Sequence, residues 1–283
     1  MNKAHHYALY QLAIVFKHPY AWLIIVVANV FGIYSLIGFQ DTLIMHDIHV
    51  PGQVLILYLT GSWNFITYGV YVLFTLFAVL YYQAPHFDQQ MAVRLGGRHR
   101  LFIGRLLSFL YISFGFSLSI LLLPIITGFV IGSSEPGWGS DMLALTQADT
   151  IMNVHPVIDT LTENASYIAS YSPLFGMFIH VMFLVWSLVI FMLLLDLVQK
   201  FLKSKLWGTV ITLGYAFFYS FLIAIPGLNT LALFTLQTHS MILPKVEGQL
   251  GGFIPYSYSV LFFIIISLAL LACSYWKERY LQI

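Results

Sequence analysis

Six apolar runs, each long enough to cross a membrane's hydrocarbon layer as a helix, are separated by more polar or broken segments in this chain. They occupy residues 20–39, 58–82, 101–131, 173–198, 206–225 and 254–276. The start of the second run is ambiguous and falls between Val54 and Trp63. Lipid cannot satisfy backbone groups, and the runs are too long and too uniformly apolar for barrel strands. We therefore expect an all-α polytopic membrane protein with six transmembrane helices in a single transmembrane domain, 1–283.

The composition agrees with lipid as the main solvent. The chain is 60% hydrophobic and only 8% charged, whereas soluble domains carry about 25% charged residues. The net charge is +1 and the basic residues are divided among several loops, so we expect no nucleic-acid partner. The single cysteine, Cys273, excludes an internal disulfide framework.

Nearly all basic residues lie near the two termini or in the segments that follow the second and fourth runs. Eleven of the 12 Lys and Arg residues fall in four clusters, and only Lys245 lies elsewhere. The clusters are Lys3 with Lys17; Arg94, Arg98, Arg100 and Arg105; Lys200, Lys203 and Lys205; and Lys277 with Arg279. Cytoplasmic loops retain Lys and Arg during insertion. The pattern predicts a multi-pass protein of the cell membrane, with both termini in the cytoplasm, in what we expect to be a bacterial plasma membrane.

Three segments outside the runs carry further signals. Residues 1–18 show helical spacing of apolar residues before His18-Pro19, which favours an interfacial helix over a disordered tail. Residues 132–172 form a long acidic segment on the outer side. Residues 226–253 are apolar but broken by prolines and glycines, so we expect short re-entrant helices in the outer leaflet.

The segment between the second and third runs predicts a short cytoplasmic helix. Pro85 begins it, Asp88 supplies negative charge near its start, and Gly96-Gly97 ends it with a turn. Such a basic loop can simply touch lipid headgroups. A compact helix with apolar side chains beside Arg94 also suits docking on another protein.

Polar groups within the runs have two interpretations. Asn29 and His180 could line a substrate path, or they could form hydrogen bonds between helices, which we consider the more common outcome. Asp196 lies four residues before Lys200, which predicts a local ion pair. His46, Asp47 and His49, with His155 and His239, match no closed metal site, and we expect no metal.

The arrangement resembles the permease subunit of a type V ABC exporter, in the bacterial ABC-type export permease family. The resemblance rests on the N-terminal helix, the six runs, the short helix after the second run and the broken segment after the fifth. It also rests on the run from Phe87 through Arg94 to Arg100 and Gly104, which is similar to that family's Gln-rich helix and R-x-G-x-R-like turn. The long segment 132–172 departs from many members, which have a short loop there.

The resemblance implies a transport subunit, not an enzyme, that exports a hydrophobic or amphipathic peptide, lipid-like molecule or drug. The chain has no G-x-x-x-x-G-K-[ST] motif, so ATP and Mg would bind a partner, and this chain would bind no cofactor. The partners implied are two copies of an ABC ATPase, a second identical or similar permease subunit, and membrane lipid. The alternatives are a secondary transporter, or a membrane immunity or assembly subunit that binds a peptide at its outer loops.

Site residues follow from the same resemblance and from the runs. Those expected to couple to the ATPase are Phe87, Asp88, Gln89, Gln90, Met91, Arg94, Leu95 and Gly96. Those expected to line the substrate path are Asn29, His180, Phe217 and Tyr219. Those expected to form an outer gate are Leu231, Phe234, Gly251 and Gly252.

Overall fold

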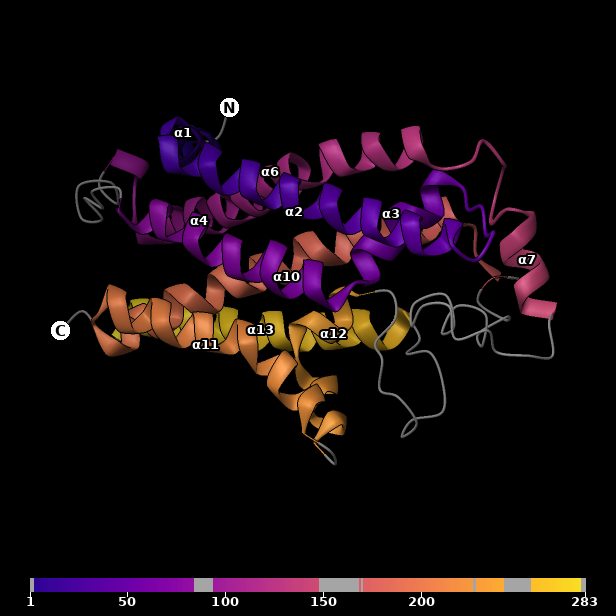
Figure 1. The fold of residues 1–283 in the computed structure, drawn as a ribbon. Coiled ribbons are helices and arrows are strands. Elements are labelled where there is room, and N and C mark those ends of the chain that lie inside the picture. Colours follow the sequence, from indigo (N-terminus) through magenta and orange to yellow (C-terminus); the bar gives the residue numbers. More distant parts are fainter. Residues whose placement is uncertain are drawn as a thin grey trace.

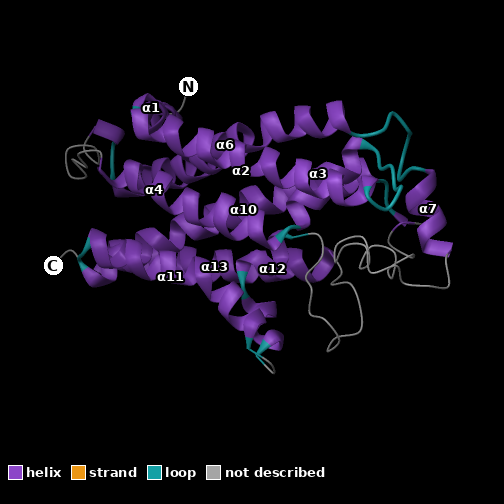
Figure 2. Ribbon diagram, viewed as in Figure 1, coloured by secondary structure: helices purple, strands orange, loops and turns teal. Residues whose placement is uncertain are grey.

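The structure, a computed structural model, is a bundle of helices. It describes residues 3–83, 94–147, 168, 170–225, 228–241 and 256–280. No strand occurs in these ranges, and the one bridge pairs Pro51 with Ser133 (Figure 2). The all-α class predicted from the apolar runs is therefore confirmed.

Five helices in the described part of the chain are long and apolar enough to cross a membrane. They are α2 (Pro19–Ile44), the stretch Phe65–Tyr82, α6 (Arg98–Ile131), α10 (Pro173–Leu202) and the stretch Tyr256–Lys277 of α13 (Tyr256–Tyr280). The run 206–225 corresponds to α11 (Lys205–Ala224), which is not among these five. A sixth span thus stays a prediction.

The second apolar run is divided in the structure. Helix α3 (Gly52–Gly61) is followed by Ser62, whose backbone is extended with φ −73° and ψ 117°. The chain continues as the π-helix η1 (Phe65–Val72) and then as α4 (Leu73–Gln83). The membrane-length stretch therefore begins at Phe65.

Hydroxyl side chains determine where two of the long helices begin. Ser172 Oγ accepts from Phe175 N at the start of α10, where Pro173 has the φ that a first turn needs. Ser204 Oγ accepts from Trp207 N at the start of α11. Between these helices Lys203 adopts the left-handed conformation, with φ 51°, so the chain reverses within two residues.

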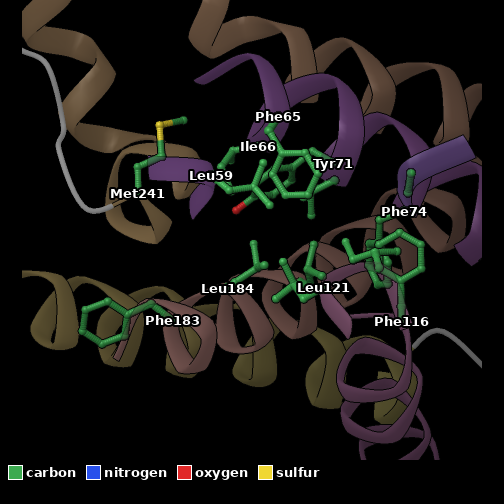
Figure 3. Close-up of a cluster of buried hydrophobic side chains, with 14 of the residues drawn as sticks. Leu59, Phe65, Ile66, Tyr71, Phe74, Phe116, Leu121, Phe183, Leu184 and Met241 are labelled. Atoms are coloured by element: carbon green, nitrogen blue, oxygen red, sulfur yellow. The ribbon is translucent and has the colours of Figure 1, made fainter. Parts of the chain in front are cut away.

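Helix α10 occupies the middle of the bundle. In Figure 1, α2, α4 and α6 lie on one side of it and α11, α12 (Leu236–Ser240) and α13 on the other. Its buried residues lie on most of its circumference, as expected for a helix with protein neighbours on both sides. Figure 3 shows the aromatic core on one of these sides, where the ring centroids of Phe74 and Phe116 are 5.1 Å apart.

The two ends of the bundle differ in charge. Both termini lie at one end, on the left in Figure 1, where α4 and α10 end and α6 and α11 begin. We call this the basic end, because it carries residues of all four basic clusters. The opposite end holds α7 (Ser140–Gln147), whose Asp141 Oδ2 accepts from His49 N at 2.7 Å. We call it the acidic end.

Helix α1 (Lys3–Lys17) exists as the sequence predicts and packs against the first half of α6. Tyr7 covers Gly104, and Leu12 and Phe16 cover Gly115. Tyr111 OH and His5 Nδ1 lie 2.6 Å apart and add a polar contact between the two helices.

Backbones approach most closely where α3 meets the end of α6. A Cβ added at Gly52 would lie 2.6 Å from Gly128 O and 2.7 Å from Phe129 Cα. Both atoms belong to backbone, so neither can rotate away. Glycine at position 52 therefore permits the contact between these helices.

We expect Gly52→Ala to destabilise the chain by about 1–3 kcal/mol, the usual cost of overpacking. Gly38→Ala on α2 is the matched control, because its Cβ would meet nothing within 4 Å. That variant should be neutral, or more stable by up to about 1 kcal/mol through helix propensity. Thermal unfolding of both purified variants in one detergent measures the difference. Equal unfolding midpoints would contradict this description of the α3–α6 contact.

Candidate functional site

The most unusual element of the bundle is α12, a single helical turn that is wholly buried. Each of its five residues is 2% exposed or less, yet four of them are polar: Gln237, Thr238, His239 and Ser240. A buried polar group without a hydrogen bond costs about 1–3 kcal/mol in protein mutational data. The partners of α12 therefore decide what this region can do.

Hydroxyl groups organise the chain that leads into α12. The 3-10 helix η2 (Asn229–Phe234) precedes it, and Thr235 adopts an extended backbone between the two. Thr238 Oγ1 donates to Ala232 O at 2.6 Å and lies 3.1 Å from Thr235 Oγ1. These local bonds fold η2 and α12 against each other.

Two residues of neighbouring elements reach the last residue of α12. Tyr71 OH, from η1, lies 3.3 Å from Ser240 Oγ. His180 Nδ1, from α10, lies 3.4 Å from Ser240 O. Figure 3 shows Tyr71 and Phe183 on the elements that face Met241, the residue after α12.

Helix α11 supplies the partners on the other side. Gln237 Nε2 donates to Ala216 O at 3.1 Å, a carbonyl in the middle of α11. Tyr215 OH accepts from Leu236 N at 3.1 Å and so satisfies the backbone at the start of α12. Contacts from η1, α10 and α11 thus all converge on five residues.

Both ring nitrogens of His239 have hydrogen-bond partners in this region. Its Nε2 lies 2.7 Å from Leu233 O, which can only accept, so Nε2 carries the proton. Its Nδ1 then accepts from Ser259 Oγ of α13 at 3.0 Å. The ring also stacks on Phe262, with centroids 4.0 Å apart. Across the described ranges no group of three His, Cys, Asp or Glu residues could hold a metal.

The structure separates the four residues expected along the substrate path. Asn29 Nδ2 donates to Ile25 O at 2.8 Å and to Ser119 O at 2.9 Å, so it joins α2 to α6. His180 contacts α12 on the far side of the bundle. Phe217 is 40% exposed and lies beside Tyr68, whereas Tyr219 is buried. Their hydrogen bonds and packing do not define a common path.

The expected outer gate is described only in part. Leu231 and Phe234 lie on η2, where they are 47% and 65% exposed. Gly251 and Gly252 lie outside the described residues. The described part of the segment therefore has an exposed apolar beginning, η2, and a buried polar end, α12.

The segment expected to couple to an ATPase is also described only in part, since Phe87, Asp88, Gln89, Gln90 and Met91 lie outside the described residues. Arg94 is exposed. Leu95 is 6% exposed and packs in a cluster with Tyr7 and Leu101. In this conformation Leu95 faces α1 and offers no apolar surface to a partner.

The end of this segment, Arg94 to Gly97, is fixed by the backbone conformation of its two glycines and by a hydrogen bond from Lys3. Gly96 and Gly97 have φ of 83° and 128°, which only glycine adopts readily, and α6 begins at the next residue. Lys3 Nζ donates to Arg94 O at 3.4 Å. The segment is therefore attached to both α1 and α6.

Further polar contacts join the helices at the basic end. Lys205 Nζ of α11 donates to Tyr82 O of α4 at 2.6 Å. Asp196 and Lys200 form the predicted ion pair, with 2.6 Å between Oδ2 and Nζ. The last turns of α4 and α10 and the first turn of α11 thus carry polar links at the basic end.

Sequence reasoning did not single out Tyr71, Tyr215, Gln237 or Ser240. The available signal was the polar quartet of residues 237–240 within a segment that is otherwise apolar. Four consecutive polar side chains in a stretch expected to enter a membrane would need protein partners. The identity of those partners could not be deduced, because they come from four other parts of the chain: η1, α10, α11 and α13.

Replacing His239 by Phe should loosen α12. The variant keeps an aromatic ring against Phe262 but leaves Leu233 O and Ser259 Oγ without their partner, at a cost of about 1–3 kcal/mol per buried group. Amide hydrogen exchange of residues 235–241 should accelerate about tenfold or more. His46→Phe is the control, because His46 is exposed near the acidic end. Unchanged exchange in His239→Phe would contradict the assigned role of this ring.

Comparison with other proteins does not identify a relative of this chain. No protein-family model, curated protein or solved structure matches it. The chain's own features are a buried polar turn in an apolar bundle and a basic end at which Arg94 and Leu95 contact α1 just before α6 begins.

Proposed function

We propose that this chain is the permease subunit of an ATP-driven exporter of the ABC type. It moves a hydrophobic or amphipathic substrate out of the cytoplasm, and a separate ATPase supplies the energy. Two permease subunits, identical or similar, pair with two ATPase subunits. The basic end faces the cytoplasm, and α11 serves as the sixth span.

This proposal rests on the contacts that Arg94 and Leu95, just before α6, make with α1. An ATPase can drive transport only if its motion reaches the helices that enclose the substrate. Arg94 and Leu95 are held by Lys3 and Tyr7 of α1, and α6 begins three residues after Leu95. A displacement of this loop is therefore passed directly to two helices, which is what a coupling element requires.

Links between α4 and its neighbours support the same function. Tyr82 ends one side of the loop and accepts from Lys205 through its backbone oxygen. Its hydroxyl also lies 3.5 Å from Met192 O of α10. Motion of the loop would thus reach α10 and α11, which contact the buried turn α12.

The orientation can be tested with cysteine labelling in a Cys273→Ser background. His46→Cys, near the acidic end, should react with a membrane-impermeant maleimide in intact cells. Lys203→Cys, at the basic end, should react only after permeabilisation, because cytoplasmic loops retain Lys and Arg. The opposite pattern would overturn both the orientation and the proposed exporter.

The coupling role can be tested by co-expression with an ATPase encoded beside the chain. Arg94→Glu should weaken co-purification about tenfold or more, because a reversed charge at an interface centre costs at least a few kcal/mol. Phe87→Ala should have a similar effect through a lost apolar anchor. Both variants should still insert into the membrane.

Lys203→Glu is the matched control, because it makes the same charge change at an exposed site of the basic end outside the loop. It should retain the ATPase and ATP-dependent export. Wild-type co-purification and export by both Arg94→Glu and Phe87→Ala would remove the loop from the mechanism.

A further inference from the structure

Two basic side chains meet on consecutive carbonyl groups where α1 lies against the start of α6. Lys3 Nζ donates to Arg94 O at 3.4 Å, and Arg100 Nη1 donates to Leu95 O, also at 3.4 Å. Each bond uses one donor, whereas a lysine ammonium has three and an arginine guanidinium has five. Both side chains are exposed and therefore present further donors to an acceptor outside the bundle.

The positive charge of this region is not balanced by acids of the same segments. Residues 3–17 and 94–105 contain two lysines and four arginines but no Asp or Glu. The end of α13 reaches the start of α6, where the ring centroids of Tyr275 and Phe102 are 5.8 Å apart. Residues 277–279 of that helix read Lys-Glu-Arg and add one more positive charge. The region thus has an excess of positive charge, which attracts an anion.

The face of α1 that points away from α6 suits the boundary between lipid headgroups and hydrocarbon. Lys3, Tyr10 and Lys17 are exposed and follow one another at intervals of seven residues, so they lie on one face of the helix. Tyr10 is 57% exposed and its neighbour Leu9 is 39% exposed. Tyrosine is common at membrane interfaces, and lysine side chains reach from there to the headgroups. This face therefore combines apolar contact with positive charge.

Helix lengths place the same region at the level of the headgroups. Helix α6 has 34 residues, so it is about 51 Å long and exceeds a hydrocarbon layer of about 30 Å. It is thus long enough to carry its first turn to the headgroups. Helix α1, beside it in Figure 1, leads directly into α2, whose first turn exposes Tyr20 and Trp22. Exposed aromatic residues of this kind favour lipid over the acidic surface of a soluble protein as the partner.

We propose that Lys3 and Arg100, with Arg98 in the same turn of α6, bind the headgroup of an anionic phospholipid. The phosphate oxygens accept from Lys3 Nζ and from the guanidinium of Arg100, whose planar fork matches phosphate geometry. The acyl chains lie along Leu9 and Tyr10 of α1. In the proposed orientation this lipid belongs to the cytoplasmic leaflet. The inference goes beyond the proposed export, because it needs neither the ATPase nor a cargo.

The test measures lipid binding to the full chain by native mass spectrometry in a non-ionic detergent. Phosphatidylglycerol and phosphatidylcholine with identical acyl chains are compared. Each Lys or Arg near an anionic headgroup strengthens binding about fivefold, so phosphatidylglycerol should bind at least about tenfold more tightly. Glycerol 3-phosphate, a soluble analogue of the headgroup, should not displace it even in excess, because the acyl chains contribute to binding.

Matched substitutions locate the site. Lys3→Gln and Arg100→Gln should each weaken the binding of phosphatidylglycerol about fivefold. Lys203→Gln is the control for Lys3→Gln, because Lys203 is another exposed lysine of the basic end, between α10 and α11. It makes the same charge change and should leave binding unchanged. In nanodiscs that contain phosphatidylglycerol, amide exchange of residues 3–10 should also be slower than in phosphatidylcholine alone.

Three results would refute the proposal. They are equal binding of the two lipids, equal weakening by Lys3→Gln and Lys203→Gln, and displacement of the lipid by glycerol 3-phosphate. The second result would assign the attraction to the charge of the whole basic end, and the third would assign it to soluble phosphates. Should Arg100→Gln fail to fold, the contrast between Lys3→Gln and Lys203→Gln still decides the outcome.

Discussion

The exclusion of water from the interior governs this structure, because polar groups there depend on other parts of the chain for hydrogen bonds. Helices satisfy their own backbone hydrogen bonds, and so the long helices can be almost entirely apolar. The turn α12 is the exception, since it carries four polar side chains into the bundle. It remains there because Tyr71, His180 and Ala216, on three elements, supply its partners.

The bundle therefore has two regions that differ in charge. At the basic end, lysines and arginines face solvent or tie helix ends together, as with Lys205 and Tyr82. At α12 every hydrogen-bonding group is uncharged. Helix α10 joins the two regions, because Asp196 lies near one end of it and His180 near the other. In the proposed exporter, the basic end would receive force from the ATPase, whereas α12 and its uncharged partners lie in the other region.

The sequence predicted what depends on local pattern. Apolar runs located the long helices, the spacing in residues 3–17 indicated α1, and the separation of Asp196 from Lys200 indicated their ion pair. It did not reveal what depends on contacts between distant segments. The burial of α12 requires partners about 20 to 170 residues away, and the inward position of Leu95 requires Tyr7. The break at Ser62 was hidden as well, because apolar residues continue on both sides of it.

The π-helix η1 has a mechanical consequence. A π-helical turn holds more residues than an α-helical turn, so a change to α-helical bonding would leave one residue over. Helix α4 would then screw about its axis by about 100°, the rotation that one α-helical residue represents. Tyr71, within η1, touches α12, while Tyr82, eleven residues on, touches α10 at the basic end. A single change of helical pitch in the bundle would therefore couple release of Tyr71 to rotation of α4 at the basic end.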